Sequence, residues 1–291
     1  MFIKTTSKGD SRQILKYSMI KKILLIPFLF LFSGCVHQVS APLIPEMDIP
    51  SSTQKLSPVV QEEKLETLVG NIFYLPVLLY HHIGDPPEGA SEDTKAWYVS
   101  SENFEAALQF IDESGYHPIF FGQLLEYLEM GVLPENSVVI SFDDGAIDFY
   151  ENAFPLLQKY HIKSVMHVQS HVRSKHWLAD DHILELFDSG LVEFGSHTKY
   201  HAYLTRISEQ EAREELQESK EKIEKLLGKE VYSIAYPFGL YNENIGKIAH
   251  DVGYKIGLTL VSGGDQDKEK LLEMKRIVVT NKSDMKKILS K

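Results

Sequence analysis

Two adjacent carboxylates stand at the end of an apolar, β-prone run of residues. The segment Ser141-Phe142-Asp143-Asp144-Gly145 follows Val138-Val139-Ile140, so both aspartates come directly after an expected buried strand. Adjacent carboxylates repel each other, and burial disfavours their charged forms. A bound cation would relieve both penalties.

A pair of histidines supplies further metal-ligand atoms. His197 and His201 lie four positions apart, about fifty residues after the aspartates. One carboxylate and two imidazoles make a three-ligand metal site that leaves coordination positions for water. The second aspartate is then available as a base that takes a proton from that water. These residue types therefore predict a metal-dependent hydrolase.

Alternating strand-like and helix-like segments must position these side chains. Apolar runs predict strands at residues 77–80, 138–142, 164–168, 192–196, 233–236, 256–260 and 277–280. Helical patterns occupy residues 102–114, 122–130, 148–160, 180–189, 209–227, 242–252 and 283–289. The alternation implies parallel βαβ units, and therefore an open doubly wound sheet or a barrel. In either fold, functional sites gather at the carboxyl ends of the strands, where Asp143, Asp144, His197 and Pro237 all fall.

The three motifs resemble those of the polysaccharide deacetylase family, the NodB-homology type of carbohydrate esterase. They are Ser-Phe-Asp-Asp-Gly at 141–145, the His197–His201 segment, and Tyr236-Pro237-Phe238-Gly239. The similarity spans about residues 75–279. Leu79-Tyr80-His81-His82-Ile83 and Arg276-Ile277 are similar to the branch that acts on poly-β-1,6-N-acetylglucosamine, a biofilm exopolysaccharide.

The resemblance implies an α/β fold, a deformed (β/α) barrel, that removes N-acetyl groups from an amino-sugar polysaccharide. Carried over by motif, Asp143 is the general base, and Asp144, His197 and His201 bind a divalent metal, most often zinc. Water activated by the metal attacks the acetamide while Asp143 takes its proton. The oxyanion is held by the metal and by a backbone N–H, that of Phe238.

Two positions depart from the pattern of many relatives. Ala235 stands where they have an arginine that orients the base, and no histidine follows His250, whereas they place a general-acid histidine near the end of the domain. His81, at the end of the first strand, is the candidate acid, and a structural histidine is an equal alternative. Arg276 is the hypothetical charge partner of Asp143.

Aromatic residues are the expected contacts of the sugar. Tyr236 belongs to the third motif, and Trp177 precedes an expected helix. Trp177 either stacks on a sugar ring or packs at the start of that helix. Five histidines gather nearby without the spacing of a second metal site: His161, His167, His171, His176 and His182.

The N-terminal region has the features of a bacterial lipoprotein signal. Lys21-Lys22 precedes the apolar run Ile23–Phe32 and then Ser33-Gly34-Cys35, which holds the single cysteine of the chain. We expect a signal peptide at 1–35, with Met19 as a possible true start, then a flexible tether at 36–70 and the catalytic domain at 71–291. A short helix at residues 61–68 is an alternative within the tether. Lipidated Cys35 would anchor the protein to a membrane of the cell envelope, outside the cytoplasm, and to the outer membrane facing the periplasm in a Gram-negative cell.

The composition limits the classes of molecule that this protein is expected to bind. The formal net charge of −11 over 291 residues argues against nucleic acid and favours a neutral glycan. Two alternatives to the leading hypothesis stay open. One is a deacetylase of peptidoglycan, chitin oligomers or O-acetyl esters, and the other is a non-catalytic glycan-binding protein on the same fold.

Overall fold

The computed structural model describes residues 64–172 and 174–290. The expected signal peptide, Met19, Cys35 and nearly all of the expected tether lie outside these residues. Among the helices of the described part of the chain, none is both long and apolar enough to cross a membrane.

A parallel sheet closes on itself around the centre of the domain. In the described residues, seven parallel strands follow one another around the barrel: β3 (Val77–Tyr80), β14 (Met274–Val278), β12 (Ile256–Ser262), β11 (Ser233–Ala235), β10 (Val192–Ser196), β9 (Ser164–Val168) and β8 (Ser137–Phe142). The barrel closes because β3 pairs with β14 and also with β8, and β6 (His117–Pro118) extends the sheet beside β8. β10 and β11 share one registered pair, and the pairing of β12 with β14 shifts register. These irregularities confirm the deformed (β/α) barrel.

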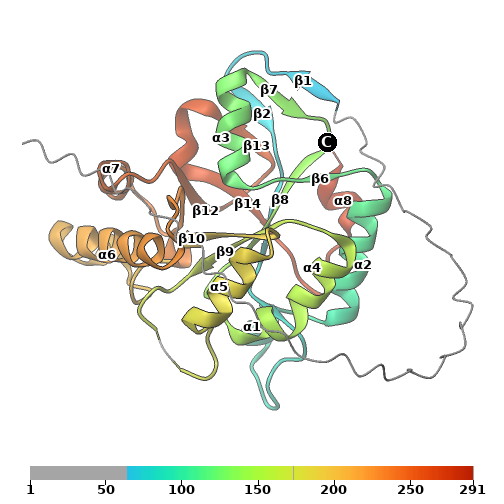
Figure 1. The fold of residues 1–291 in the computed structure, drawn as a ribbon, viewed down its shortest axis with the longest axis horizontal. Coiled ribbons are helices and arrows are strands. Elements are labelled where there is room, and N and C mark those ends of the chain that lie inside the picture. Colours follow the sequence, from blue (N-terminus) through green and yellow to red (C-terminus); the bar gives the residue numbers. More distant parts are fainter. Residues whose placement is uncertain (1–63, 173, 291) are drawn as a thin grey trace, which may run out of the picture. The chain divides into compact units, whose positions relative to one another are not determined.

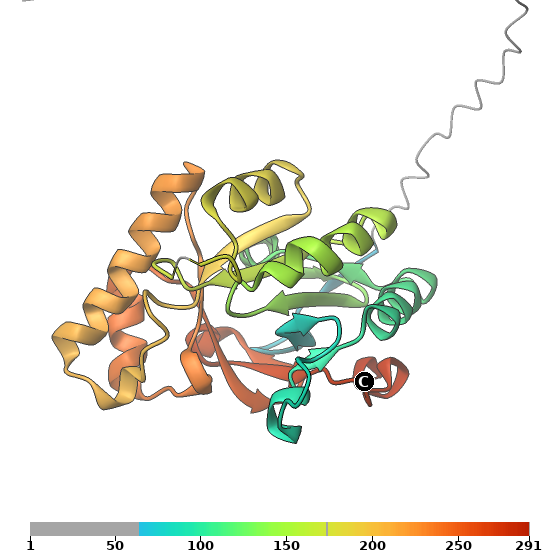
Figure 2. The ribbon, with the colours of Figure 1, turned by 90° about the horizontal axis from the view of Figure 1, so that it is seen from below.

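Helices cover the outside of the strands (Figures 1 and 2). They are α1 (Glu92–Lys95), α2 (Ser101–Glu113), α3 (Phe121–Met130), α4 (Phe154–Tyr160), α5 (Asp180–Asp188), α6 (Glu209–Leu227), α7 (Glu243–Val252) and α8 (Met285–Leu289). In Figure 1, α6 and α7 lie on one side of the barrel and α2, α4 and α8 on the other. Short 3-10 turns are η2 (Leu204–Arg206), η3 (Pro237–Gly239) and η4 (Lys268–Glu273). Two-stranded ribbons at the rim pair β1 (Leu65–Thr67) with β7 (Val132–Pro134), β2 (Ile72–Tyr74) with β13 (Asp265–Asp267), and β4 (His82–Ile83) with β5 (Tyr98–Val99).

The long helix α6 shows how local sequence sets an element. Ser208 Oγ accepts the N–H of Glu211 while the Glu211 carboxylate accepts the N–H of Ser208, which is a capping box. Gly228 ends the helix in the left-handed region with φ 65°. Ala212, Leu216 and Ile223 form its buried face against the barrel. The helix therefore matches the predicted residues 209–227.

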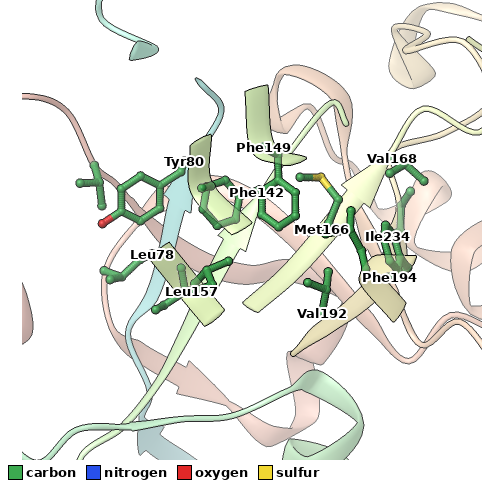
Figure 3. Packing of buried hydrophobic residues seen from close by; sticks show 14 of the residues in the cluster. Leu78, Tyr80, Phe142, Phe149, Leu157, Met166, Val168, Val192, Phe194 and Ile234 are labelled. Atoms are coloured by element: carbon green, nitrogen blue, oxygen red, sulfur yellow. The ribbon is translucent and has the colours of Figure 1, made fainter. Parts of the chain in front are cut away.

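The core lies between the barrel strands and the helices. Every residue of β8 and of β9 is buried, as expected of parallel strands covered on both faces. Phe142 stacks on Tyr80 with ring centroids 5.3 Å apart and meets Phe149 edge to face at 4.7 Å. Figure 3 shows these rings packed in one layer with Met166 and Leu78. This packing holds the end of β8 rigid at the point where Asp143 follows.

Several elements differ from the predicted ranges. The last strand, predicted at 277–280, is Met274–Val278, so Arg276 lies inside it. The helix predicted at 148–160 begins as a π-helix, η1 (Phe149–Ala153), and continues as α4, because Pro155 has no N–H to continue the α-helical bonding. The prediction of a short helix at 61–68 is wrong at Leu65–Thr67, because these residues form strand β1, which pairs antiparallel with β7. This pairing lies within the expected tether, so the folded part begins before residue 71.

Candidate active site

The carboxyl ends of the barrel strands surround one cavity of about 360 Å³. Asp143 and Asp144 follow β8, His197 follows β10, and Tyr236 and Phe238 follow β11. All five line this cavity together with His81 and His201. The three motifs, separated by up to a hundred residues of sequence, thus meet at one site as the strand-end argument predicted.

Asp144, His197 and His201 form a cluster suited to a metal ion. One ligand atom from each residue lies within 4.8 Å of the others. Asp144 Oδ1 is 3.4 Å from His197 Nε2 and 3.6 Å from His201 Nε2. One carboxylate oxygen and two imidazole nitrogens are a donor set that zinc and related divalent ions accept. The residues present therefore fit the expected metal.

Neighbouring groups orient these three side chains. His197 Nδ1 donates to the carbonyl oxygen of Ala235 at 2.7 Å, which leaves Nε2 free to bind a metal. Gln169 Nε2 donates to Asp144 Oδ1 at 2.8 Å. Burial, and then the charge of His197, lower the pKa of His201, which favours the neutral imidazole that metals bind. Hydrogen bonds within the protein thus orient His197 and Asp144 for metal binding.

The backbone at the site adopts unusual conformations. Asp144, Thr198, His201 and Phe238 have φ of 77°, 63°, 61° and 60°, in the left-handed region that residues other than glycine rarely occupy. The histidine loop is tied down because the N–H groups of Lys199 and Tyr200 both donate to one carboxylate oxygen of Glu215 on α6, at 3.0 and 2.9 Å. The N–H of His201 also donates to Thr198 Oγ1 at 3.0 Å. These contacts offset the backbone strain.

Asp143 is a buried carboxylate with a buried cation as its partner. Arg276 Nη1 lies 2.9 Å from Asp143 Oδ1 and 2.8 Å from Oδ2. Burial alone would raise the pKa of Asp143, but the positive charge of Arg276, together with His197 and His167, outweighs it and holds that pKa well below the usual range. Asp143 is therefore ionised at neutral pH, as a base must be. The hypothesis that Arg276 is its charge partner is confirmed.

His167 is a second close neighbour of Asp143, and its sequence pattern predicts no role for it. It lies in β9, with Nδ1 3.5 Å from Asp143 Oδ1 and Nε2 3.0 Å from Ser233 Oγ. Burial lowers the pKa of His167. A histidine inside an otherwise apolar, fully buried strand was the sequence signal that could have identified it.

His81 lies at the cavity, as predicted. Its ring is 4.4 Å from the ring of Trp97, with an interplanar angle of 50°. Burial lowers the pKa of His81 to about 4, although the carboxylates of Asp143 and Asp144 act in the opposite direction. The imidazole is therefore neutral at pH 7.

The aromatic residues are arranged differently from the expectation. The side chains that line the cavity include Trp97, Tyr98 and Phe238, and Trp177 lies outside that lining. The backbone of Trp177 instead forms a β-bridge with Ala146, just after the aspartates. Tyr236 is among the residues that line the cavity, but it is fully buried and its hydroxyl donates to the carbonyl oxygen of Leu272 at 3.0 Å. The sequence offered no pattern that would place Trp97, on a loop with a one-turn helix, at the site.

Comparisons with known proteins agree with this geometry. The family model described as "Polysaccharide deacetylase" matches residues 131–257, which include both aspartates, both histidines and Phe238. The protein YxkH of Bacillus subtilis (strain 168) is 28% identical over 208 residues, 71% of each chain. The poly-beta-1,6-N-acetyl-D-glucosamine N-deacetylase of Staphylococcus epidermidis is 28% identical over 205 residues, 66% of this chain and 71% of that one.

A solved structure shares the fold. The deacetylase PplD of Streptococcus pyogenes, in complex with acetate, superposes with a TM-score of 0.68 at 28% identity, over 75% of this chain and 97% of that one. Sequence motifs, barrel and site geometry all lead to the same assignment. This chain is similar to the polysaccharide deacetylase family in its family-model match, its relatives and its fold.

Proposed function

We propose that this protein is a metal-dependent hydrolase that removes N-acetyl groups from an amino-sugar polysaccharide. The favoured substrate is poly-β-1,6-N-acetylglucosamine, because the Staphylococcus epidermidis relative has that activity in its name and the His81 and Arg276 segments resemble that branch. Zinc is the expected ion. One observation supports the proposal above the others: the Asp144, His197 and His201 cluster lies in one cavity with the ionised, Arg276-bound carboxylate of Asp143.

Each residue has a defined task in this reaction. Asp144, His197 and His201 would hold the metal. When bound, the ion lowers the pKa of water and polarises the acetamide carbonyl. Asp143 takes the proton of the attacking water, and Arg276 and His167 keep its carboxylate oriented. The N–H of Phe238, in a turn at the cavity wall, is the proposed donor to the oxyanion.

The leaving nitrogen needs one proton to depart as an amine. His81 lines the same cavity and is the proposed donor. Because its lowered pKa leaves the imidazole neutral at pH 7, His81 donates only after it has received the proton that Asp143 takes from the water. The proton that Asp143 takes from water balances the proton that the nitrogen receives, so the products are acetate and a free amino sugar.

The test is acetate release from poly-β-1,6-N-acetylglucosamine by the full chain, with added zinc and with a chelator. We expect release that requires the metal and is lost in Asp143→Asn and Asp144→Ala. His250→Ala is the matched control, because His250 is exposed and outside the cavity. Unchanged release in Asp144→Ala would reject the metal site. Acetate release only from peptidoglycan, chitin oligomers or O-acetyl esters would mean that the substrate assignment is wrong. Glycan binding without turnover would indicate a non-catalytic binding protein.

We also propose that lipidated Cys35 anchors the protein to the outside of the cytoplasmic membrane, or to the outer membrane in a Gram-negative cell. The support is the order of basic, apolar and small residues before the single cysteine. Growth with a radiolabelled fatty acid tests it, because one cysteine gives one possible thioether site. Label should appear in the wild type and vanish in Cys35→Ser, and label in both would refute the assignment.

A further inference from the structure

The loop that carries both histidine ligands is held from two sides. It spans residues 197–201, directly after β10. On one side, the N–H of Ser170 donates to the carbonyl oxygen of Thr198 at 3.1 Å. The N–H of His171 donates to the carbonyl oxygen of Lys199, also at 3.1 Å. On the other side lies α6, which packs against β10 (Figure 1).

Glu215 is the residue of α6 that holds the loop backbone. One oxygen of its carboxylate, Oε2, accepts the N–H of Lys199 at 3.0 Å and the N–H of Tyr200 at 2.9 Å. These two residues lie between the expected ligands His197 and His201. Because two consecutive N–H groups point at one oxygen, this acceptor fixes the backbone that sets the spacing of the two imidazoles.

Ser219 makes a second contact, one helical turn after Glu215. Its hydroxyl oxygen is 2.7 Å from Ser196 Oγ, and both serines are buried. Ser196 Oγ also accepts the N–H of Thr198 at 3.1 Å. Residues four positions apart lie on the same face of a helix, so one face of α6 presents both contacts to the loop.

The helix itself is firmly placed. The carbonyl oxygen of Leu216 accepts the hydroxyl of the buried Tyr254 at 2.9 Å. Lys220 Nζ donates to the carbonyl oxygen of Val231 at 2.9 Å. The loop is therefore held against a support that is fixed by its own contacts, and α6 lies outside the three sequence motifs.

We propose that α6 preorganises the metal site, with Glu215 and Ser219 as positioning residues that set its affinity for the divalent ion. The inference rests on the proposed function and deepens it, because it assigns metal retention to side chains outside the cavity lining. Thr198 and His201 have φ of 63° and 61°, a conformation that an unsupported loop would rarely adopt. A loop already held in this conformation binds the ion without a further cost in conformational entropy.

Zinc affinity tests this inference without turnover. The full chain is stripped with a chelator and titrated with zinc in competition with a chromophoric chelator. We expect Glu215→Ala to raise the dissociation constant about 10–100-fold, as the loss of an outer-shell contact does. Glu215→Gln should bind zinc like the wild type, because its amide oxygen can accept both N–H groups. Glu214→Ala is the matched control, since Glu214 is an exposed residue of the same helix that bonds to Gln210.

Ser219→Ala is the second variant, which keeps the test decisive if Glu215→Ala fails to fold. It removes one buried hydroxyl and should weaken zinc binding in the same direction. An unchanged dissociation constant in the folded variants would overturn the inference. Equal weakening in Glu215→Gln and Glu215→Ala would also overturn it, since the charge and not the hydrogen bonds would then act on the ion. A wild type that binds no zinc would refute the metal dependence of the proposed function as well.

Discussion

Asp143 and Arg276 form a buried ion pair across 133 residues of sequence, with side chains 2% and 1% exposed. Arg276 Nε also donates to the carbonyl oxygen of Thr259 at 3.0 Å, which fixes the plane of the guanidinium. Asp143 follows β8, whereas Arg276 lies within β14, and β3 separates the two strands. The charge that orients the base therefore comes from the last barrel strand, and Ala235 does not need to be an arginine.

Breaking the ion pair between Asp143 and Arg276 should destabilise the folded protein. Arg276→Gln leaves the carboxylate of Asp143 buried without a cation, so we expect a loss of about 3–5 kcal/mol in the free energy of unfolding, measured with urea. Acetate release should fall at least tenfold at neutral pH, because the pKa of Asp143 rises and its orientation is lost. The double variant Asp143→Asn/Arg276→Gln should recover part of the stability and none of the activity. Full activity in Arg276→Gln would exclude its positioning role.

Gly195 is required because His167 packs over it. A Cβ at this position would lie 2.3 Å from His167 Cδ2 and 2.5 Å from Ser233 Oγ. Gly195→Ala should displace His167 from Asp143, reduce stability by about 1–3 kcal/mol and reduce acetate release. Gly115→Ala is the control, since nothing lies within 4 Å of its added Cβ and its cost is backbone strain alone, at φ 69°. Equal behaviour of the two variants would argue against the steric explanation.

Metal binding should stabilise the fold. Zinc added to the chelator-treated protein should raise the melting temperature, because an ion that binds the folded state shifts the unfolding equilibrium. In His197→Ala and His201→Ala this increase should disappear, together with zinc retained after dialysis, as measured by mass spectrometry of the metal. His250→Ala should behave as the wild type. Zinc retained at one equivalent in both cluster variants would locate the ion elsewhere.

His81 should make the protein sensitive to acid. Burial lowers its pKa from 6.5 to about 4, so between these values the unfolded chain binds more protons than the folded one. The stabilisation is present above about pH 6.5 and is lost as the pH falls toward 4. We expect a loss of about 2 kcal/mol across this window in the wild type and a smaller one in His81→Phe. Parallel stability curves for the two proteins would contradict this pKa.

Local patterns were sufficient to predict the ordered elements near the motifs. The strands predicted at 164–168 and 192–196 and the helix at 209–227 match the structure residue for residue. An apolar run bounded by polar residues, or a capping box with a terminal glycine, encodes these elements within a few residues of sequence. Elements of two or three residues, such as β4 and β5, have no comparable pattern and exist only because they pair with each other.

The sequence by itself therefore predicted the family resemblance, the barrel that this resemblance implies and the four candidate site residues Asp143, Asp144, His197 and His201, since each motif is contiguous and follows a recognisable strand. The tertiary structure alone decided which distant side chains meet them. Closure of the barrel brings Arg276 and His167 to Asp143, and the β4–β5 pairing brings Trp97, rather than Trp177, to the cavity. Such contacts depend on strand order and register around a closed sheet, and no local run of residues encodes either.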